Sequence, residues 1–183
     1  MCCLPETDEF RALAQELTFI ERAAQHSADL VVESTRKITP QNVPEEMVSH
    51  IALNALHFYV CVEDALSRIA RVVDHSLPTG EQSHISLLRQ MAVELPDVRP
   101  PVISEETFYH LDQMRSFRHR LVHAYQERLE WRQMADVTGS IPDCMAALHQ
   151  DLERFRAFLL AVHAAARPAG RTSRRHRLDP KGR

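Results

Sequence analysis

The feature that most constrains the fold is a run of apolar residues, spaced alternately three and four apart, near the end of the chain. This spacing places every member on one face of an α-helix, and it is typical of a helix that packs nearly antiparallel to its neighbours. No segment shows the alternation of apolar and polar residues that predicts a half-buried β-strand. The stripe consists of Met145, Leu148, Leu152, Phe155, Leu159 and Val162.

Similar apolar stripes of helical period precede this one and are separated by helix breakers. The chain has only four glycines, which argues against a sheet with many tight turns. We therefore predict an all-α fold, an antiparallel bundle of four long helices plus one short helix. The expected helices cover about residues 8–36, Pro44 to the turn at 77–80, a short helix from its cap Ser83, a helix from its cap Ser104 into residues 117–125, and a last helix that follows the break at 138–140 with Ser140 as its cap.

The composition is ordinary for a soluble protein, with 44% hydrophobic and 26% charged residues. The cysteines Cys2, Cys3, Cys61 and Cys144 form no C-x-x-C pair, and the N-terminus does not resemble a signal peptide. No apolar run approaches the ~20 residues that cross a bilayer. We expect a cytoplasmic protein that does not enter the membrane.

The last 17 residues differ in charge from the rest of the chain. Seven basic residues begin at Arg167 and face one acid, Asp179, so this tail carries about +6 and the preceding residues about −9. Such a tail either holds RNA through its phosphates or is a disordered solubilising end, and the lack of aromatic residues favours the second interpretation. We predict one helical domain at residues 1–166 and a basic, disordered tail at 167–183.

Residues 117–125 concentrate cations, imidazoles and a phenol, and they contain the spacing R-x-x-x-x-H-x-Y formed by Arg118, His123 and Tyr125. At about 100° per residue, Arg118 and Tyr125 nearly eclipse, whereas Arg118 and His123 diverge by roughly 140°. One straight helix therefore cannot direct both Arg118 and His123 at one phosphate. Either the helix loosens near Val122, or two copies of the segment meet across a symmetry axis, and we favour the dimer.

Arg115, Arg118 and Arg120 lie within six residues, among apolar neighbours. An arginine fork binds phosphate bidentately, and a histidine such as His123 exchanges protons near neutral pH. These two groups suffice for RNA cleavage, because the imidazole removes a 2′-hydroxyl proton while the guanidinium stabilises charge on the phosphate. No metal or other cofactor is then required. Nucleophile-elbow, Walker-type and Rossmann patterns are all missing, which excludes the common hydrolase and NTPase templates.

A metal site is the weaker interpretation of the same segment. His119 and His123 are four residues apart, but Arg120 stands where the H-E-x-x-H pattern has its glutamate, and a cation there opposes a metal ion. Each of the three motif residues also has a purely structural interpretation. Arg118 could form a salt bridge with Glu127 or Glu130, His123 could be a structural histidine, and Tyr125 could simply bury its ring.

The residues 117–119 and 123–125 resemble the HepT-like branch of the HEPN superfamily, whose hallmark is R-x(4 to 6)-H, and the similarity covers roughly residues 45 to 165. The resemblance implies a homodimeric bundle that acts as a metal-independent ribonuclease toxin, with Arg118 and His123 as its catalytic residues. His119 occupies the polar position after the arginine, where Asn is common, and we expect it to contact RNA with Arg115 and Arg120.

The resemblance also implies a partner. Tyr125 matches the tyrosine that a separately encoded nucleotidyltransferase antitoxin of the MNT type modifies with AMP, which would place the chain in a type VII-like toxin–antitoxin pair. An added phosphate beside Arg118 would occupy the anion site and repel RNA. The competing hypothesis is a non-catalytic module that uses the arginine cluster to bind a nucleotide or to dock a nucleotidyltransferase.

Overall fold

The computed structural model describes residues 7–39, 42–123 and 130–166, and only the backbone of Thr7, Val122 and His123. The described residues contain no β-strand, so the prediction of an all-α helical bundle is confirmed. The helices are α1 (Thr7–Arg36), α2 (Glu45–Val72), α3 (Ser83–Ala92), α4 (Glu105–His123), α5 (Ala135–Gly139) and α6 (Ile141–Ala166), with a short 3-10 helix η1 (Trp131–Gln133).

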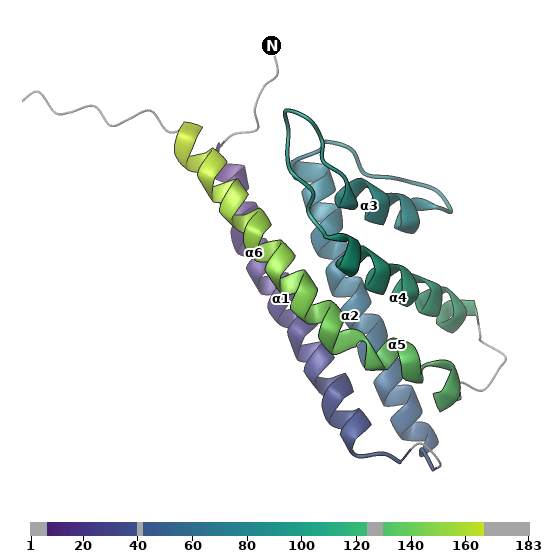
Figure 1. The fold of residues 1–183 in the computed structure, drawn as a ribbon. Coiled ribbons are helices and arrows are strands. Elements are labelled where there is room, and N and C mark those ends of the chain that lie inside the picture. The colour runs from purple at the N-terminus through teal and green to yellow at the C-terminus, as the bar shows by residue number, and fades with distance from the viewer. Residues whose placement is uncertain (1–6, 40–41, 124–129, 167–183) are drawn as a thin grey trace, which may run out of the picture.

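The long helices α1, α2 and α6 form the body of the bundle (Figure 1). Helix α1 packs against both α2 and α6 and runs antiparallel to each of them. Helices α3 and α4 contact one another and pack against α2 on the side away from α1 in this view. The antiparallel arrangement that we expected therefore holds for α1, α2 and α6, while α3 and α4 form an added pair beside α2.

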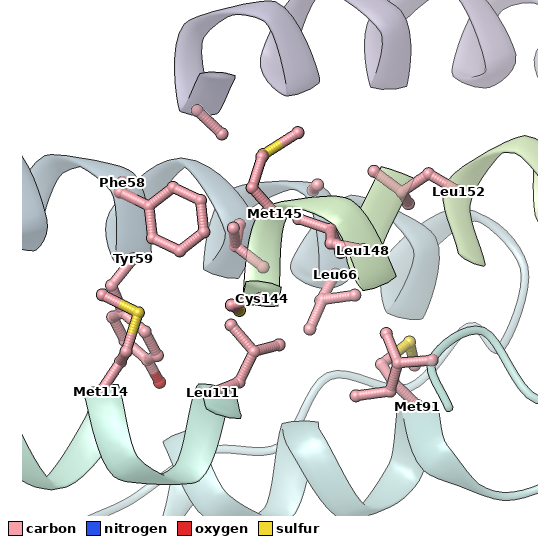
Figure 2. Packing of buried hydrophobic residues seen from close by; sticks show 14 of the residues in the cluster. Phe58, Tyr59, Leu66, Met91, Leu111, Met114, Cys144, Met145, Leu148 and Leu152 are labelled. Atoms are coloured by element: carbon pink, nitrogen blue, oxygen red, sulfur yellow. The ribbon is translucent and has the colours of Figure 1, made fainter. Parts of the chain in front are cut away.

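A single hydrophobic core joins these helices (Figure 2). Phe58 of α2, Leu111 of α4 and Leu148 of α6 are each at most 1% exposed and belong to the same cluster. The stripe along α6 lies in this core as its spacing predicted, with Val162 only half-buried at the end of the seam. Burial of this stripe fixes the rotation of α6 about its own axis.

Three serine caps were predicted, and the structure distinguishes between them. Ser104 caps α4, because the backbone N–H of Thr107 donates to its Oγ at 3.2 Å. Ser83 is not a cap, since α3 begins with it and the residue before it makes no side-chain cap hydrogen bond. The Ser140 hydroxyl donates to the carbonyl of Val137 at 2.9 Å, which ties it to the end of α5. Helix α5 was not predicted, because five residues are too few to show a period.

Two buried acids fix the position of α3 and α4. Asp74, just after α2, pairs with Arg99 in the segment between α3 and α4. Asp151 of α6 accepts hydrogen bonds from the backbone N–H of Ser104 at 2.8 Å and from the Thr107 hydroxyl at 2.6 Å, so it holds the N-terminus of α4. Both acids are buried, so these polar contacts are shielded from water.

The turn predicted after α2 is present, with Gly80 at a φ of 89°, a backbone conformation that favours glycine. The basic tail at 167–183 lies outside the described residues, so its predicted disorder remains an expectation. Among the residues that the structure describes, no helix is long and apolar enough to span a bilayer.

Candidate functional site

A pocket of about 350 Å³ lies between α3, with the two residues that precede it, and the C-terminal half of α4. Its wall is formed mainly by charged and polar side chains, including three arginines and two histidines against one acid. Such a surface is suited to a polyanion, because each arginine presents several N–H donors. The lining residues are Glu81, Gln82, His84, Ile85, Arg89, Arg115, Arg118 and His119.

Three of the residues predicted from the sequence meet in this pocket. Arg115, Arg118 and His119 occupy positions three and four apart on α4, so helical geometry places them on one face. Arg118 is half-buried and His119 is exposed. Arg120 is exposed and does not line the pocket, because it lies on another face of the same helix.

Arg118 is held by a histidine from the neighbouring helix. Its Nη1 lies 3.1 Å from Nε2 of His84, the second residue of α3. The other ring nitrogen of His84, Nδ1, forms a short contact with Oε1 of Glu63 on α2. Side chains from three helices, α2, α3 and α4, therefore form one polar chain from Glu63 through His84 to Arg118.

The proton positions in this chain follow from the donors available. An arginine N–H only donates, so Nε2 of His84 must accept the hydrogen bond from Arg118. The proton of the neutral ring is then on Nδ1, where it is donated to the carboxylate of Glu63. This arrangement defines both the tautomer and the orientation of the imidazole.

A buried tyrosine supports Glu63 from one turn earlier on α2. The hydroxyl of Tyr59 donates to Oε1 of Glu63 at 3.3 Å. Burial, and next the charge of Glu63, raise the pKa of Tyr59, while the nearby Arg118 and Arg115 lower it by less. Tyr59 thus remains a protonated donor and helps to fix the carboxylate that orients His84.

The other arginines of the pocket differ in their pairing. Arg115 donates from Nε to Asp112 at 2.7 Å on its own helix, and this pair is about one-third exposed. Arg89 is exposed and lines the pocket from α3. Glu127 and Glu130 were the two acids proposed as salt-bridge partners for Arg118. Glu130 caps η1, and Glu127 lies outside the described residues.

The described backbone tests one alternative for the catalytic pair. Helix α4 continues without a break through His123, so the loosening near Val122 that would align Arg118 with His123 does not occur. The side chain of His123 and all of Tyr125 lie outside what the structure describes. Their roles remain predictions from the sequence.

The sequence analysis missed His84, Glu63 and Arg89. His84 and Glu63 are 21 residues apart and lie on different helices. A lone histidine near a helix start gives no local signal, and only the packing of α3 against α2 and α4 brings it to Arg118. Arg89 is likewise an ordinary helix residue in the sequence.

The fold and this pocket define an all-α bundle protein with a cationic, histidine-containing site. The family model described as HepT-like protein matches residues 50–159, which is more than half of the chain and includes every residue that lines the pocket. The chain therefore belongs to the HepT-like family of the HEPN superfamily. Searches of curated proteins and of solved structures found no match.

Proposed function

We propose that this protein is a metal-independent endoribonuclease, the toxin of a type VII-like pair with a nucleotidyltransferase antitoxin. The observation that carries the proposal is the position of Arg118, half-buried in a pocket that also contains Arg115, Arg89 and two histidines, in a chain of the HepT-like family. Toxins and ribonucleases are the activities that this family suggests.

In the proposed reaction, RNA enters the pocket with its phosphates against the arginines. Arg118 donates to the scissile phosphate and stabilises the charge that develops on it, which typically contributes a factor of about 10²–10³ in rate. His123 supplies an imidazole for proton transfer. Arg115, His119 and Arg120 hold the flanking RNA, with Arg120 acting outside the pocket.

The proposal requires a homodimer. Because α4 is helical through His123, the Cα positions of Arg118 and His123 lie roughly 140° apart around the helix axis. A two-fold axis next to α4 would bring Arg118 of one protomer to His123 of the other. Each dimer would then contain two composite sites.

Cleavage by purified protein in the presence of EDTA is the first test. We expect single-stranded RNA to be cut, leaving a 2′,3′-cyclic phosphate and a 5′-hydroxyl. Arg118→Ala and His123→Ala should each lower the rate by at least about 10²-fold. Intact RNA at high protein concentration would reject the ribonuclease and favour the non-catalytic module that binds nucleotides or docks a nucleotidyltransferase.

A mixed dimer tests whether the site is shared between protomers. Arg118→Ala and His123→Ala chains, each with a different affinity tag, are co-expressed and the heterodimer is isolated by two successive affinity steps. A shared site leaves one of the two sites intact, so about half of the wild-type activity should return. Sites contained within single protomers would leave the heterodimer as inactive as either parent.

The proposed regulation acts on Tyr125. Co-expression with a cognate MNT-type nucleotidyltransferase should add AMP to Tyr125, detected as an adenylate mass on the peptide that contains it. The adduct would place a phosphate near Arg118 and exclude RNA from the pocket. Tyr125→Phe should stay unmodified and remain toxic when the partner is present.

A further inference from the structure

We infer that His84 is a second catalytic histidine, the general base that removes the 2′-hydroxyl proton, with Glu63 as the carboxylate that orients it. The inference rests on the proposed ribonuclease function and adds a residue outside the R-x(4 to 6)-H motif. Its basis is the Glu63–His84–Arg118 chain, which is complete within one protomer.

The geometry of His84 is that of an oriented base. Its Nδ1 proton is committed to Glu63, and its Nε2 lone pair is directed toward the pocket side chain Arg118. A carboxylate on Nδ1 holds an imidazole in the tautomer that accepts a proton on Nε2 and stabilises the imidazolium that results. The side chain of His84 is 36% exposed, so a ligand in the pocket can reach it, whereas that of Glu63 is only 18% exposed.

The contact with Arg118 also explains how the base is released. In the structure, one Arg118 N–H occupies Nε2 of His84. When a phosphate enters, the guanidinium turns its donors onto the phosphate oxygens, and the adjacent 2′-hydroxyl takes its place at Nε2. Arg118 and the 2′-hydroxyl thus exchange positions on one ring nitrogen.

The reaction then balances as a transesterification. The 2′-O–H bond breaks and its proton goes to Nε2 of His84, while the 2′-oxygen forms a bond to phosphorus. The bond between phosphorus and the 5′-oxygen breaks, and that oxygen takes a proton from the imidazolium of His123. This assigns His123 the leaving-group transfer, in place of the 2′-hydroxyl transfer that the sequence suggested for it.

The charged groups around His84 come from each element that meets there. Glu63 faces it from α2, Arg118 faces it from α4, and the pocket wall adds Arg115 and His119 from α4, Arg89 from α3 and Glu81 from the preceding segment. The pH dependence of the cleavage rate will reflect all of these groups. A variant that tests His84 must therefore remove its proton transfer and keep its hydrogen bonds.

His84→Gln meets that requirement. Its side-chain oxygen can accept from Arg118 and its amide N–H can donate to Glu63, but it cannot carry a proton between them. We expect it to bind an uncleavable 2′-O-methyl RNA with wild-type Kd, to cleave RNA about 10²–10⁴-fold more slowly, and to lose the acid limb of the pH–rate profile. His26→Gln, an exposed histidine on α1, is the matched control and should behave as wild type.

The outcomes separate the two proposals. His84→Gln within threefold of the wild-type rate, with Arg118→Ala inactive, overturns the role of His84 and leaves the ribonuclease intact. A wild-type protein that does not cleave RNA overturns both. Slow cleavage by His84→Gln with unchanged RNA affinity and an altered pH profile supports the general base, because a purely positioning residue would be replaced by glutamine without these losses.

Discussion

Asp74 and Arg99 form a bidentate ion pair in which both side chains are at most 2% exposed. The Arg99 Nε and Nη2 atoms lie 2.6 and 2.7 Å from the two carboxylate oxygens of Asp74. Arg99 also donates to the carbonyls of Gln90, Val93 and Pro100. The pair therefore joins the end of α2 to the segment that follows α3, and it holds in place the short helix that carries His84.

Asp74→Ala should strongly destabilise the fold. It leaves the Arg99 guanidinium buried without its counter-charge, and breaking a buried pair in this way typically costs about 3–5 kcal/mol. Urea unfolding followed by circular dichroism measures the loss. Asp64→Ala is the matched control, because its ion pair with Arg68 is 40–45% exposed and exposed pairs contribute at most about 1 kcal/mol. Equal losses of unfolding free energy in the two variants would contradict the prediction that the buried pair contributes more than the exposed one.

Asp151→Ala should loosen the start of α4. The carboxylate accepts from the Ser104 backbone N–H, the Ser104 hydroxyl and the buried Thr107 hydroxyl, and these donors would lose their acceptor. Leaving buried donors unpaired costs about 1–3 kcal/mol. Hydrogen exchange of the first amides of α4 should accelerate. Asp151→Asn keeps an acceptor oxygen and should lose less, and an Asn variant as unstable as Ala would contradict this prediction.

Cys144 gives the fold a pH dependence at alkaline pH. Burial raises the pKa of this thiol from 9.0 to about 12. Below pH 9 the thiol is protonated in both states, and above it the unfolded chain releases a proton that the folded protein keeps, so stability falls as pH rises. The loss should reach about 1.4 kcal/mol at pH 10. Urea unfolding at pH 8 and pH 10 should show this component in the wild type and not in Cys144→Ala.

Arg89→Ala should weaken RNA binding through charge. Arg89 lines the pocket beside Arg115 and Arg118, so we expect it to neutralise one phosphate. Its removal should reduce the slope of log K against log salt by about 0.7, the value for one contact on a single strand. Anisotropy with an uncleavable 2′-O-methyl RNA measures this slope. Arg11→Ala, an exposed arginine on α1, should leave the slope unchanged.

Much of the fold could be predicted because helical period is a local property. The apolar stripe of α6 and the helix-start signals at Pro44 and Ser104 located the long helices to within a few residues of their observed bounds. The short elements were less accessible. Helix α5 and the true start of α3 depend on which turns pack against α2, and that packing leaves no period in so few residues.

Some residues of the candidate site could likewise be predicted from the sequence, and others could not. Arg115 and Arg118 were identified because they belong to a local cluster of arginines, and His119 was identified because it follows the arginine of the motif. Glu63 and His84 were not, because the contact between them joins residues of different helices whose separation along the chain carries no signal. Arg120 is exposed on a face of α4 that does not border the pocket. Which face of α4 borders the pocket is set by how this helix packs against its neighbours.

The sequence by itself determined that this protein is an all-α bundle with an arginine–histidine motif on α4, because both properties follow from spacing along a helix. Only the tertiary structure decided which groups surround Arg118. Packing of α3 against α2 and α4 brings His84 to the guanidinium and Glu63 to the imidazole. Such contacts depend on the relative position of three helices, which is set by burial of the whole core and not by any single segment.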